Sequence, residues 1–391
     1  MDLPQELIDT IIDNLRNNPA SLRACSLVAQ SWTSRSQRHL FSAVVIWSDT
    51  LHLWHKNISP SSDSVSSYIR DLSLSANEGS RDPRFSPNLL NLAHEHFASI
   101  QELESLKLFR WTLVNWECYT RSFGSLSMSL HELQLIQPTS DTTALLSLAT
   151  FFFRIERIVI ISPSILSTDT SNFYPPAGLR LGWKIVHFMS FGGRCAAFLQ
   201  KLAELPEAFV WEQLTLGLAS DVYRLDVFPR LLSSCSATLR TLRIIRIHPD
   251  NDTTAHLISG DITLPPLPEL REIEFPVVIS PLLHGAQLPT EQGSGWLHER
   301  LILSITSTRL SVVTMNLERI PGNLLEFGVD WDGVDRAFAA VGRKICAAHA
   351  NSRLVVRFVT LTLEMRDRLR GMGEEGWMQH FQKVGIIEVV N

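Results

Sequence analysis

The feature that most constrains the fold is a short phrase of the form apolar-x-x-apolar-x-apolar, which recurs along the chain. Copies begin at Ile69, Leu103, Leu130, Ile155, Trp211, Leu239 and Leu270. Adjacent copies lie about 25 to 34 residues apart, except across one longer interval. The end of each copy alternates with period two, which is typical of a strand. In the longer interval, 181–189 (LGWKIVHFM) is a degenerate candidate for a further copy.

Stretches with apolar residues at helical spacing separate several of these predicted strands. They cover 89–100, 142–153, 194–205 and 227–233. A strand followed by a helix, repeated, indicates a solenoid, because neither half buries its apolar face without its neighbours. The spacing lies near the upper end of the leucine-rich-repeat range, but the asparagine of regular leucine-rich repeats is missing. An ordinary α/β domain with Leu-rich strands is the alternative.

The last third departs from the phrase. The clearest loop is 285–295 (GAQLPTEQGSG), and beyond it we expect three helices and three strands. The helices are predicted at 296–304, 331–350 and 375–384, and the strands at 310–317, 354–363 and 386–390. The open end of a solenoid needs a distinct unit to cover its core. We therefore predict a solenoid over 42–284, followed by C-terminal repeats and an α/β cap over 285–391.

The first 41 residues have a different pattern. Apolar residues at helical spacing (Leu7, Ile8, Ile11, Ile12 and Leu15) predict a first helix with one broad apolar stripe. Pro19 is placed to begin a second helix, where its missing N–H has no intrahelical partner. Gln30 and Ser31 interrupt the helical pattern after the second helix. A third helix is expected over 32–40, and a strand is expected over 43–47. Three short helices cannot bury all of this apolar surface among themselves.

The same segment resembles an F-box of the kind found at the N-terminus of large families of fungal (mushroom-type) proteins. The resemblance rests on Leu3-Pro4-x-Glu6-Leu7, Ile11-Ile12-x-x-Leu15, Leu22-x-x-Cys25-Ser26-Leu27-Val28, Trp32 and Arg38-x-Leu40-Phe41. The repeat-like body and the closing Gly-Ile-Ile-Glu-Val resemble the remainder of such proteins. The resemblance implies docking on the Skp-type linker of an SCF (Skp–cullin–F-box) ubiquitin ligase, and through it on a cullin, while the body holds a protein substrate.

We expect about half of the apolar stripe to pack internally and half to contact the partner. The expected linker-binding residues are Leu3, Pro4, Glu6, Leu7, Ile11, Leu15, Leu22, Leu27, Val28 and Trp32. Ile8, Ile12 and Cys25 are expected inside the module. In the body, the expected substrate contacts are Lys107, Gln134 and Arg243, which occupy the position before the last apolar residue of their phrases. Arg243 suits carboxylate or phosphate, although a solvated edge is the alternative.

Composition excludes several classes of partner and compartment. The formal net charge is −5, so no basic field favours nucleic acid or an anionic membrane. Five scattered cysteines without a C-x-x-C pair argue against a disulfide framework or a zinc site. We find neither a secretory signal nor a stretch long enough to span a bilayer. The expected location is therefore cytoplasmic or nuclear.

Catalytic motifs are scarce. His94-Glu95-His96 is the one close cluster of histidine and carboxylate, but positions i and i+2 of a helix point apart. Gly293-Ser294-Gly295 lacks the strand–turn–helix context of a nucleophile elbow. We therefore predict no catalytic residue, metal or cofactor, and expect a non-catalytic adaptor. The alternatives are an F-box scaffold outside ubiquitin transfer and an α/β enzyme whose helical N-terminus resembles an F-box.

Overall fold

The computed structural model of the chain divides into two compact units, residues 1–183 and 184–391. The structure describes residues 3–47, 50, 65–76, 100, 102–113, 129–170, 173, 179–205, 209–218, 227–246, 264–279, 307, 309–319, 354–360 and 385–390. Each unit contains a parallel sheet with helices, so the predicted α/β class with parallel strands is confirmed.

Three short helices begin the first unit: α1 (Gln5–Asn14), α2 (Pro19–Val28) and α3 (Gln30–Leu40). The predicted start of α2 at Pro19 is confirmed, and the Asn18 side chain caps the helix by accepting from Ser21 N at 3.1 Å. The predicted interruption at Gln30 and Ser31 is wrong. A single extended residue, Ala29, separates α2 from α3, because one residue in the β region suffices to end one helix and begin the next.

The helices enclose a small apolar core. Ile8, Ile12 and Leu22 are buried at its centre. Leu15, Trp32 and Leu40 pack around it, partly buried, and Cys25 is also buried. The expectation that Ile8, Ile12 and Cys25 lie inside the module is confirmed.

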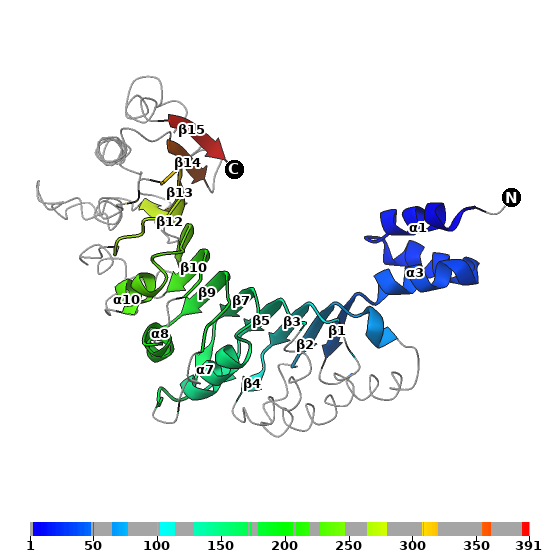
Figure 1. Ribbon diagram of the computed structural model, residues 1–391, viewed down its shortest axis with the longest axis horizontal. Helices are drawn as coiled ribbons and strands as arrows, with labels where there is room; N and C mark the ends of the chain where they lie inside the picture. Colours follow the sequence, from blue (N-terminus) through cyan, green and yellow to red (C-terminus); the bar gives the residue numbers. More distant parts are fainter. Residues whose placement is uncertain are drawn as a thin grey trace, which may run out of the picture. The chain divides into compact units, whose positions relative to one another are not determined.

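The sheet of the first unit has the strand order β1-β2-β3-β5-β7 among the described residues. The strands are β1 (Ala43–Trp47), β2 (Asp71–Ser75), β3 (Ser105–Phe109), β5 (Glu132–Ile136) and β7 (Arg157–Ile161), and η1 (Val65–Tyr68) precedes β2. All neighbours are parallel, and the register sets equivalent phrase positions side by side, such as Leu106, Leu133 and Ile158. The phrase therefore builds continuous apolar rows across the strands, which lie side by side in Figure 1.

A recurring turn follows three of these strands. Arg110, Gln137 and Ser162 have φ of 59°, 51° and 50°, a left-handed conformation that is costly for residues other than glycine. Backbone bonds compensate, since Arg110 N donates to Ile136 O and Gln137 N donates to Ile161 O, both at 2.8 Å. The turns lead into a second, three-stranded parallel sheet of β4 (Thr112–Leu113), β6 (Thr139–Ser140) and β8 (Ser164–Ile165).

Helix α7 (Thr142–Phe151) follows β6 and confirms the helix predicted there. The Asp141 side chain caps it by accepting from Ala144 N at 2.6 Å. Seven of its ten residues are buried, and the helix lies against one side of the sheet (Figure 1). The phrase leucines of this sheet are almost entirely removed from solvent, as are most residues of α7.

The sheet of the second unit has the order β9-β10-β11-β12-β13-β14-β15, again all parallel. Its strands are β9 (Ile185–Phe191), β10 (Gln213–Leu218), β11 (Thr241–Arg246), β12 (Glu272–Ile279), β13 (Val312–Arg319), β14 (Leu354–Thr360) and β15 (Gly385–Val390). Strand β9 occupies the degenerate copy, with Trp183, Val186 and Phe188 buried at the phrase positions. The strands predicted in the last third are also present.

Helices α8 (Ala196–Ala203), led by η3 (Gly193–Cys195), and α10 (Val227–Ser234) lie on one side of this sheet, beside β9 and β10 (Figure 1). The Phe198 ring of α8 meets Phe188 edge-on at 5.8 Å, and Phe188 lies 6.1 Å from the Trp211 ring. Trp211 stacks on Phe209 at 4.2 Å. These four rings are buried and pack together in the core of the second unit.

Several predicted elements lie outside the described residues: most of the helix at 89–100, the loop at 285–295 and the helices at 296–304, 331–350 and 375–384. Within the described parts, no helix combines the length and apolarity that crossing a membrane requires.

Phe188→Ala should destabilise the chain by about 3–5 kcal/mol, because it removes a fully buried ring whose neighbours cannot close the cavity. Chemical denaturation followed by tryptophan fluorescence would measure the loss. The matched control is Met189→Ala, one residue further along β9 on the opposite, half-buried face. Equal losses for the two variants would contradict the assignment of the buried face.

Candidate partner-binding surfaces

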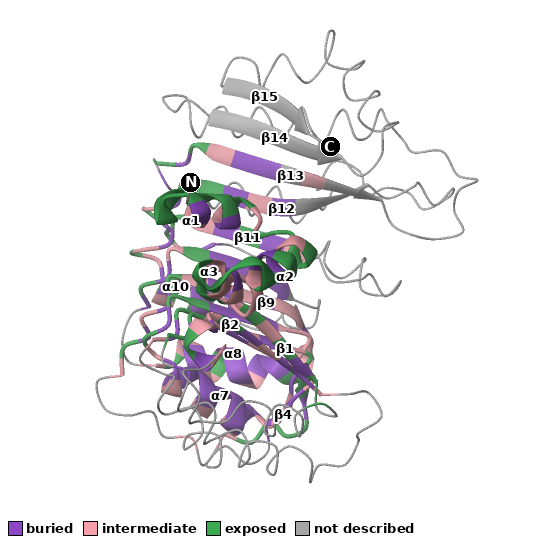
Figure 2. Cartoon of the chain, turned by 90° about the vertical axis from the view of Figure 1, so that its right-hand side faces the viewer, coloured by how far each residue is buried: buried purple, intermediate pink, exposed green. Residues whose placement is uncertain are grey.

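Helix α1 leaves a row of apolar side chains in solvent. Leu3, just before the helix, is 52% exposed, Leu7 is 51% exposed and Ile11 is 41% exposed. The three are spaced by four residues, so they share one side, while Ile8 and Ile12 turn toward the core. Figure 2 colours much of α1 as exposed, beside its buried residues. One helix thus presents two apolar faces, of which only one is used internally.

The end of α2 contributes a second exposed group. Leu27 is 86% exposed and Val28 is 65% exposed. The Gln5 side chain donates to Ser31 O at 3.3 Å, which places the start of α1 beside the junction of α2 and α3. Leu3, Leu7, Ile11, Leu27 and Val28 are named here the helical apolar patch. Clustered exposed side chains of this kind mark an interaction surface.

The remaining predicted linker contacts differ in accessibility. Pro4 and Glu6 are exposed beside the patch, whereas Leu15 and Trp32 are partly buried against the core. Leu22 is 1% exposed at the centre of the core. The prediction that Leu22 contacts a partner is therefore corrected: its side chain packs the three helices together and is not available at the surface.

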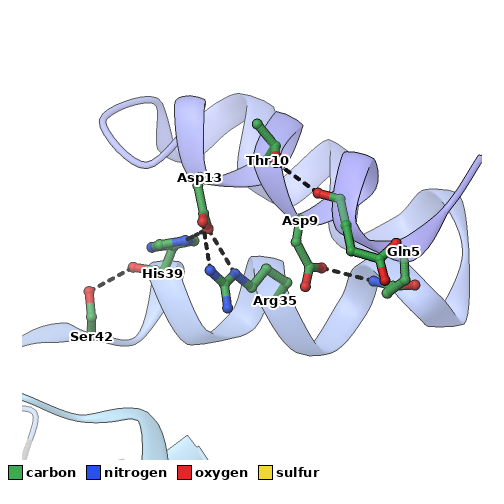
Figure 3. A network of polar contacts seen from close by, with 8 residues as sticks. Gln5, Asp9, Thr10, Asp13, Arg35, His39 and Ser42 are labelled. Carbon is green, nitrogen blue, oxygen red and sulfur yellow. Dashed lines mark hydrogen bonds and ion pairs between the residues drawn. The ribbon is translucent and has the colours of Figure 1, made fainter.

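A polar network joins α1 to α3 (Figure 3). Arg35 donates two hydrogen bonds to the Asp13 carboxylate, from Nε to Oδ1 at 2.7 Å and from Nη2 to Oδ2 at 2.6 Å. His39 Nε2 lies 2.7 Å from Oδ1 of the same carboxylate. Because a carboxylate only accepts, Nε2 must carry the hydrogen of that bond. The two helices are thereby held in a fixed relation, which keeps the patch in place.

The network changes the acidity of Asp13. The two hydrogen bonds from Arg35, and then the one from His39, hold the pKa of the Asp13 carboxyl well below its ordinary value of 3.8. Both charged side chains remain about a third or more exposed, so water and salt screen the pair. The network therefore contributes a modest stabilisation and a defined geometry.

The predicted substrate contacts lie in different units. Lys107 of β3 and Gln134 of β5 are side by side in the register of the first unit, both half-buried. Arg243 of β11 belongs to the second unit. There its Nε lies 3.1 Å from Glu274 Oε2, and Glu274 Oε1 accepts from Asn316 at 2.8 Å. Arg243 already pairs with Glu274 of the same chain. It is therefore a weaker candidate than Lys107 for binding an acidic substrate.

Sequence reasoning missed an apolar group on the same face as Lys107. Val45 and Trp47 of β1 are 58% and 48% exposed, and their register partners Ser73 and Ser75 belong to the alternate positions of β2. The sequence of β1 is Ala-Val-Val-Ile-Trp, which is apolar at every position and gives no sign of which residues face solvent. Only the register of β1 with β2 shows that Val45 and Trp47 lie on the same face as Lys107.

A comparison with models of known protein families gives no match, and a comparison with curated proteins gives none either.

Asp13→Asn should weaken the attachment of α1 to α3 by roughly 1 kcal/mol at neutral pH, the scale of a screened, charge-assisted pair. Amide hydrogen exchange of α1 residues in the full chain should quicken about fivefold. Because the folded pKa is depressed, this contribution is complete above the ordinary carboxyl pKa. It disappears as the pH falls through the folded value. The difference between wild type and variant should therefore shrink in acid.

Asp9→Asn is the control, because Asp9 sits on the same helix and accepts from Gln5 of α1, at 2.8 Å, so its bond stays within one helix. An exchange rate in Asp13→Asn no faster than in Asp9→Asn would contradict a role for the network in holding the helices.

Proposed function

We propose that the chain is the substrate-recognition adaptor of an SCF-type ubiquitin ligase. In this proposal residues 1–41 form an F-box that docks on the Skp-type linker subunit, and the linker joins it to a cullin. Residues 42–284 form an irregular leucine-rich-repeat-like solenoid that binds a protein substrate, and 285–391 complete and cap it. The adaptor itself carries out no catalysis and acts in the cytoplasm or nucleus.

The helical apolar patch is the observation that carries the proposal. Its five side chains are at least 41% exposed, on a module whose core is closed without them. Burying one such side chain is worth about 1.5–3 kcal/mol, so the group together suffices to drive association once the entropy of binding is subtracted. Seven of the ten residues that the F-box resemblance assigns to the linker are exposed, whereas Leu15 and Trp32 are partly buried and Leu22 is buried.

The body supports the second half of the proposal. Rows of phrase leucines run in register through parallel strands, with helices on the buried side, as expected of stacked strand–helix units. The opposite face carries mixed side chains that the fold does not need for its core, such as Lys107 and Gln134. Because the core does not depend on these side chains, this face of the sheet is available to bind a protein substrate.

The scaffold alternative uses the same patch and differs only in the events after linker binding. The enzyme alternative needs a reactive group. Among the described cysteines, Cys235 is a poor candidate, because burial raises the pKa of its thiol to about 12 and keeps it protonated. The adaptor function accounts for both the patch and the exposed sheet face, so we favour it.

The joint substitution Leu3→Ala and Leu7→Ala should weaken binding to a purified Skp-type linker at least tenfold, because both side chains belong to the exposed centre of the patch. Calorimetry or interferometry with the full chain measures the affinity. Leu166→Ala is the matched control, since Leu166 is 59% exposed but lies beyond β8, outside the module. The control should bind like wild type.

Absence of linker binding by the folded wild-type chain would refute the F-box. Linker binding without recruitment of a cullin, or without ubiquitin transfer in a reconstituted ligase, would favour the scaffold over the adaptor.

A further inference from the structure

The sheet of the first unit has two unlike faces. At the phrase positions, residues such as Leu106, Leu133 and Ile158 have no exposed surface. Most of the alternate positions retain exposure, and within the described residues no helix covers them. We call this second side the open face. Its residues are set in rows by the register, one residue from each strand.

One row of the open face is largely apolar. It consists of Trp47 of β1, Ser75 of β2, Phe109 of β3, Ile136 of β5 and Ile161 of β7, joined by successive register pairs. Trp47 is 48% exposed, the phenylalanine and both isoleucines are half-buried, and Ser75 is buried. Such side chains do not contribute fully to the core. They leave a narrow apolar strip across the carboxyl-terminal ends of the strands.

The spacing of this strip matches a helix better than an extended chain. Adjacent strands lie about 4.8 Å apart, so the strip offers a side chain at about that interval along β3, β5 and β7, and Trp47 of β1 lies two strands from Phe109. Along one side of an α-helix, residues three or four apart are separated by about 5 Å of rise. Along one side of an extended chain, the interval is about 6.7 Å. A helix lying across the strands can therefore place one side chain over each of β3, β5 and β7 and reach Trp47 of β1 beyond the buried Ser75.

Positive charge flanks the strip on both sides. Lys107 lies in the adjacent row, and among the described residues it has no ion-pair partner. Arg110 follows Phe109, and its guanidinium carbon sits 5.0 Å from the centre of that ring, while its Nε donates to Gln137 Oε1 at 2.8 Å. The carboxylates of Asp71 and Glu132 lie in the row beyond Lys107, away from the strip. Glu132 is already engaged, with Arg157 Nε 3.2 Å from its Oε1.

We propose that the open face binds an amphipathic α-helix of a partner protein, with its aliphatic stripe along Trp47, Phe109, Ile136 and Ile161. Carboxylates beside that stripe pair with Lys107 and approach Arg110. Crossing from β1 to β7 spans about 19 Å, which corresponds to about 13 helical residues. The identification of this partner as the substrate rests on the proposed adaptor function, whereas the surface itself does not.

The test is a selection from a displayed library of random peptides of about 20 residues, with the folded full chain as target. The enriched peptides should carry aliphatic residues at i, i+3 or i+4 and i+7, flanked by Asp or Glu. Trp47→Ser should reduce their affinity about tenfold, as expected of an interface aromatic. Lys107→Glu should reduce it by a similar factor, and should restore binding of peptides whose acidic residues are replaced by lysine.

Two controls separate this surface from the F-box. Leu166→Ser changes an exposed leucine of the same unit outside the strip and should leave peptide affinity unchanged. Leu7→Ala should weaken linker binding and leave peptide binding intact, while Trp47→Ser should do the reverse.

The inference is overturned if no peptide is enriched by a chain that still binds the linker. Two other results would also overturn it. One is enriched peptides whose aliphatic residues recur at every second position, and the other is peptides whose affinity is unchanged by Trp47→Ser and Lys107→Glu. Peptide binding of the expected kind by a chain that fails to bind the linker would support the surface and refute the adaptor function.

Discussion

The structure depends on the in-register stacking of one apolar phrase across parallel strands. Each strand contributes side chains such as Leu133 and Leu135 to rows that continue into its neighbours, and these rows are removed from water. A single strand–helix unit could not bury them, because many of its apolar contacts come from adjacent copies. The recurring left-handed turn at Arg110, Gln137 and Ser162 shows the same constraint in the backbone: a costly conformation is kept where neighbouring turns and strands hold it in place.

The N-terminal helices also have more apolar side chains than one unit can bury, but they have no stacked neighbours to cover them. Their core is too small to absorb every apolar residue, so Ile8, Ile12 and Leu22 close it while the helical apolar patch remains in solvent. The geometry of such a module cannot come from burial alone. The carboxylate of Asp13, held by Arg35 and His39, supplies a directional link between α1 and α3. Packing therefore closes the core, and the charge-assisted bonds add a directional contact between α1 and α3.

The two surfaces have different chemistry and suit different tasks. The helical apolar patch is aliphatic and lies on short helices, which suits docking in the hydrophobic groove of a single, unvarying partner protein. The open face of the first sheet combines an apolar strip with positive charge, which suits a partner chosen by charge as well as by shape. A chain that carries both can join two proteins, one through each surface.

The sequence alone determined the class of the fold and the position of most described strands, because period two and period 3.6 are local properties of the chain. It also determined that Ile8, Ile12 and Cys25 are internal. It could not place Leu22, since the phrase Leu22-x-x-Cys25 is equally apolar on a contact surface and in a core. Nor could it reveal the open-face strip. Trp47, Phe109, Ile136 and Ile161 are far apart in sequence, and Ala-Val-Val-Ile-Trp has no alternation to orient it. Only the register between strands brings these residues into one row, because register is decided by contacts between distant segments.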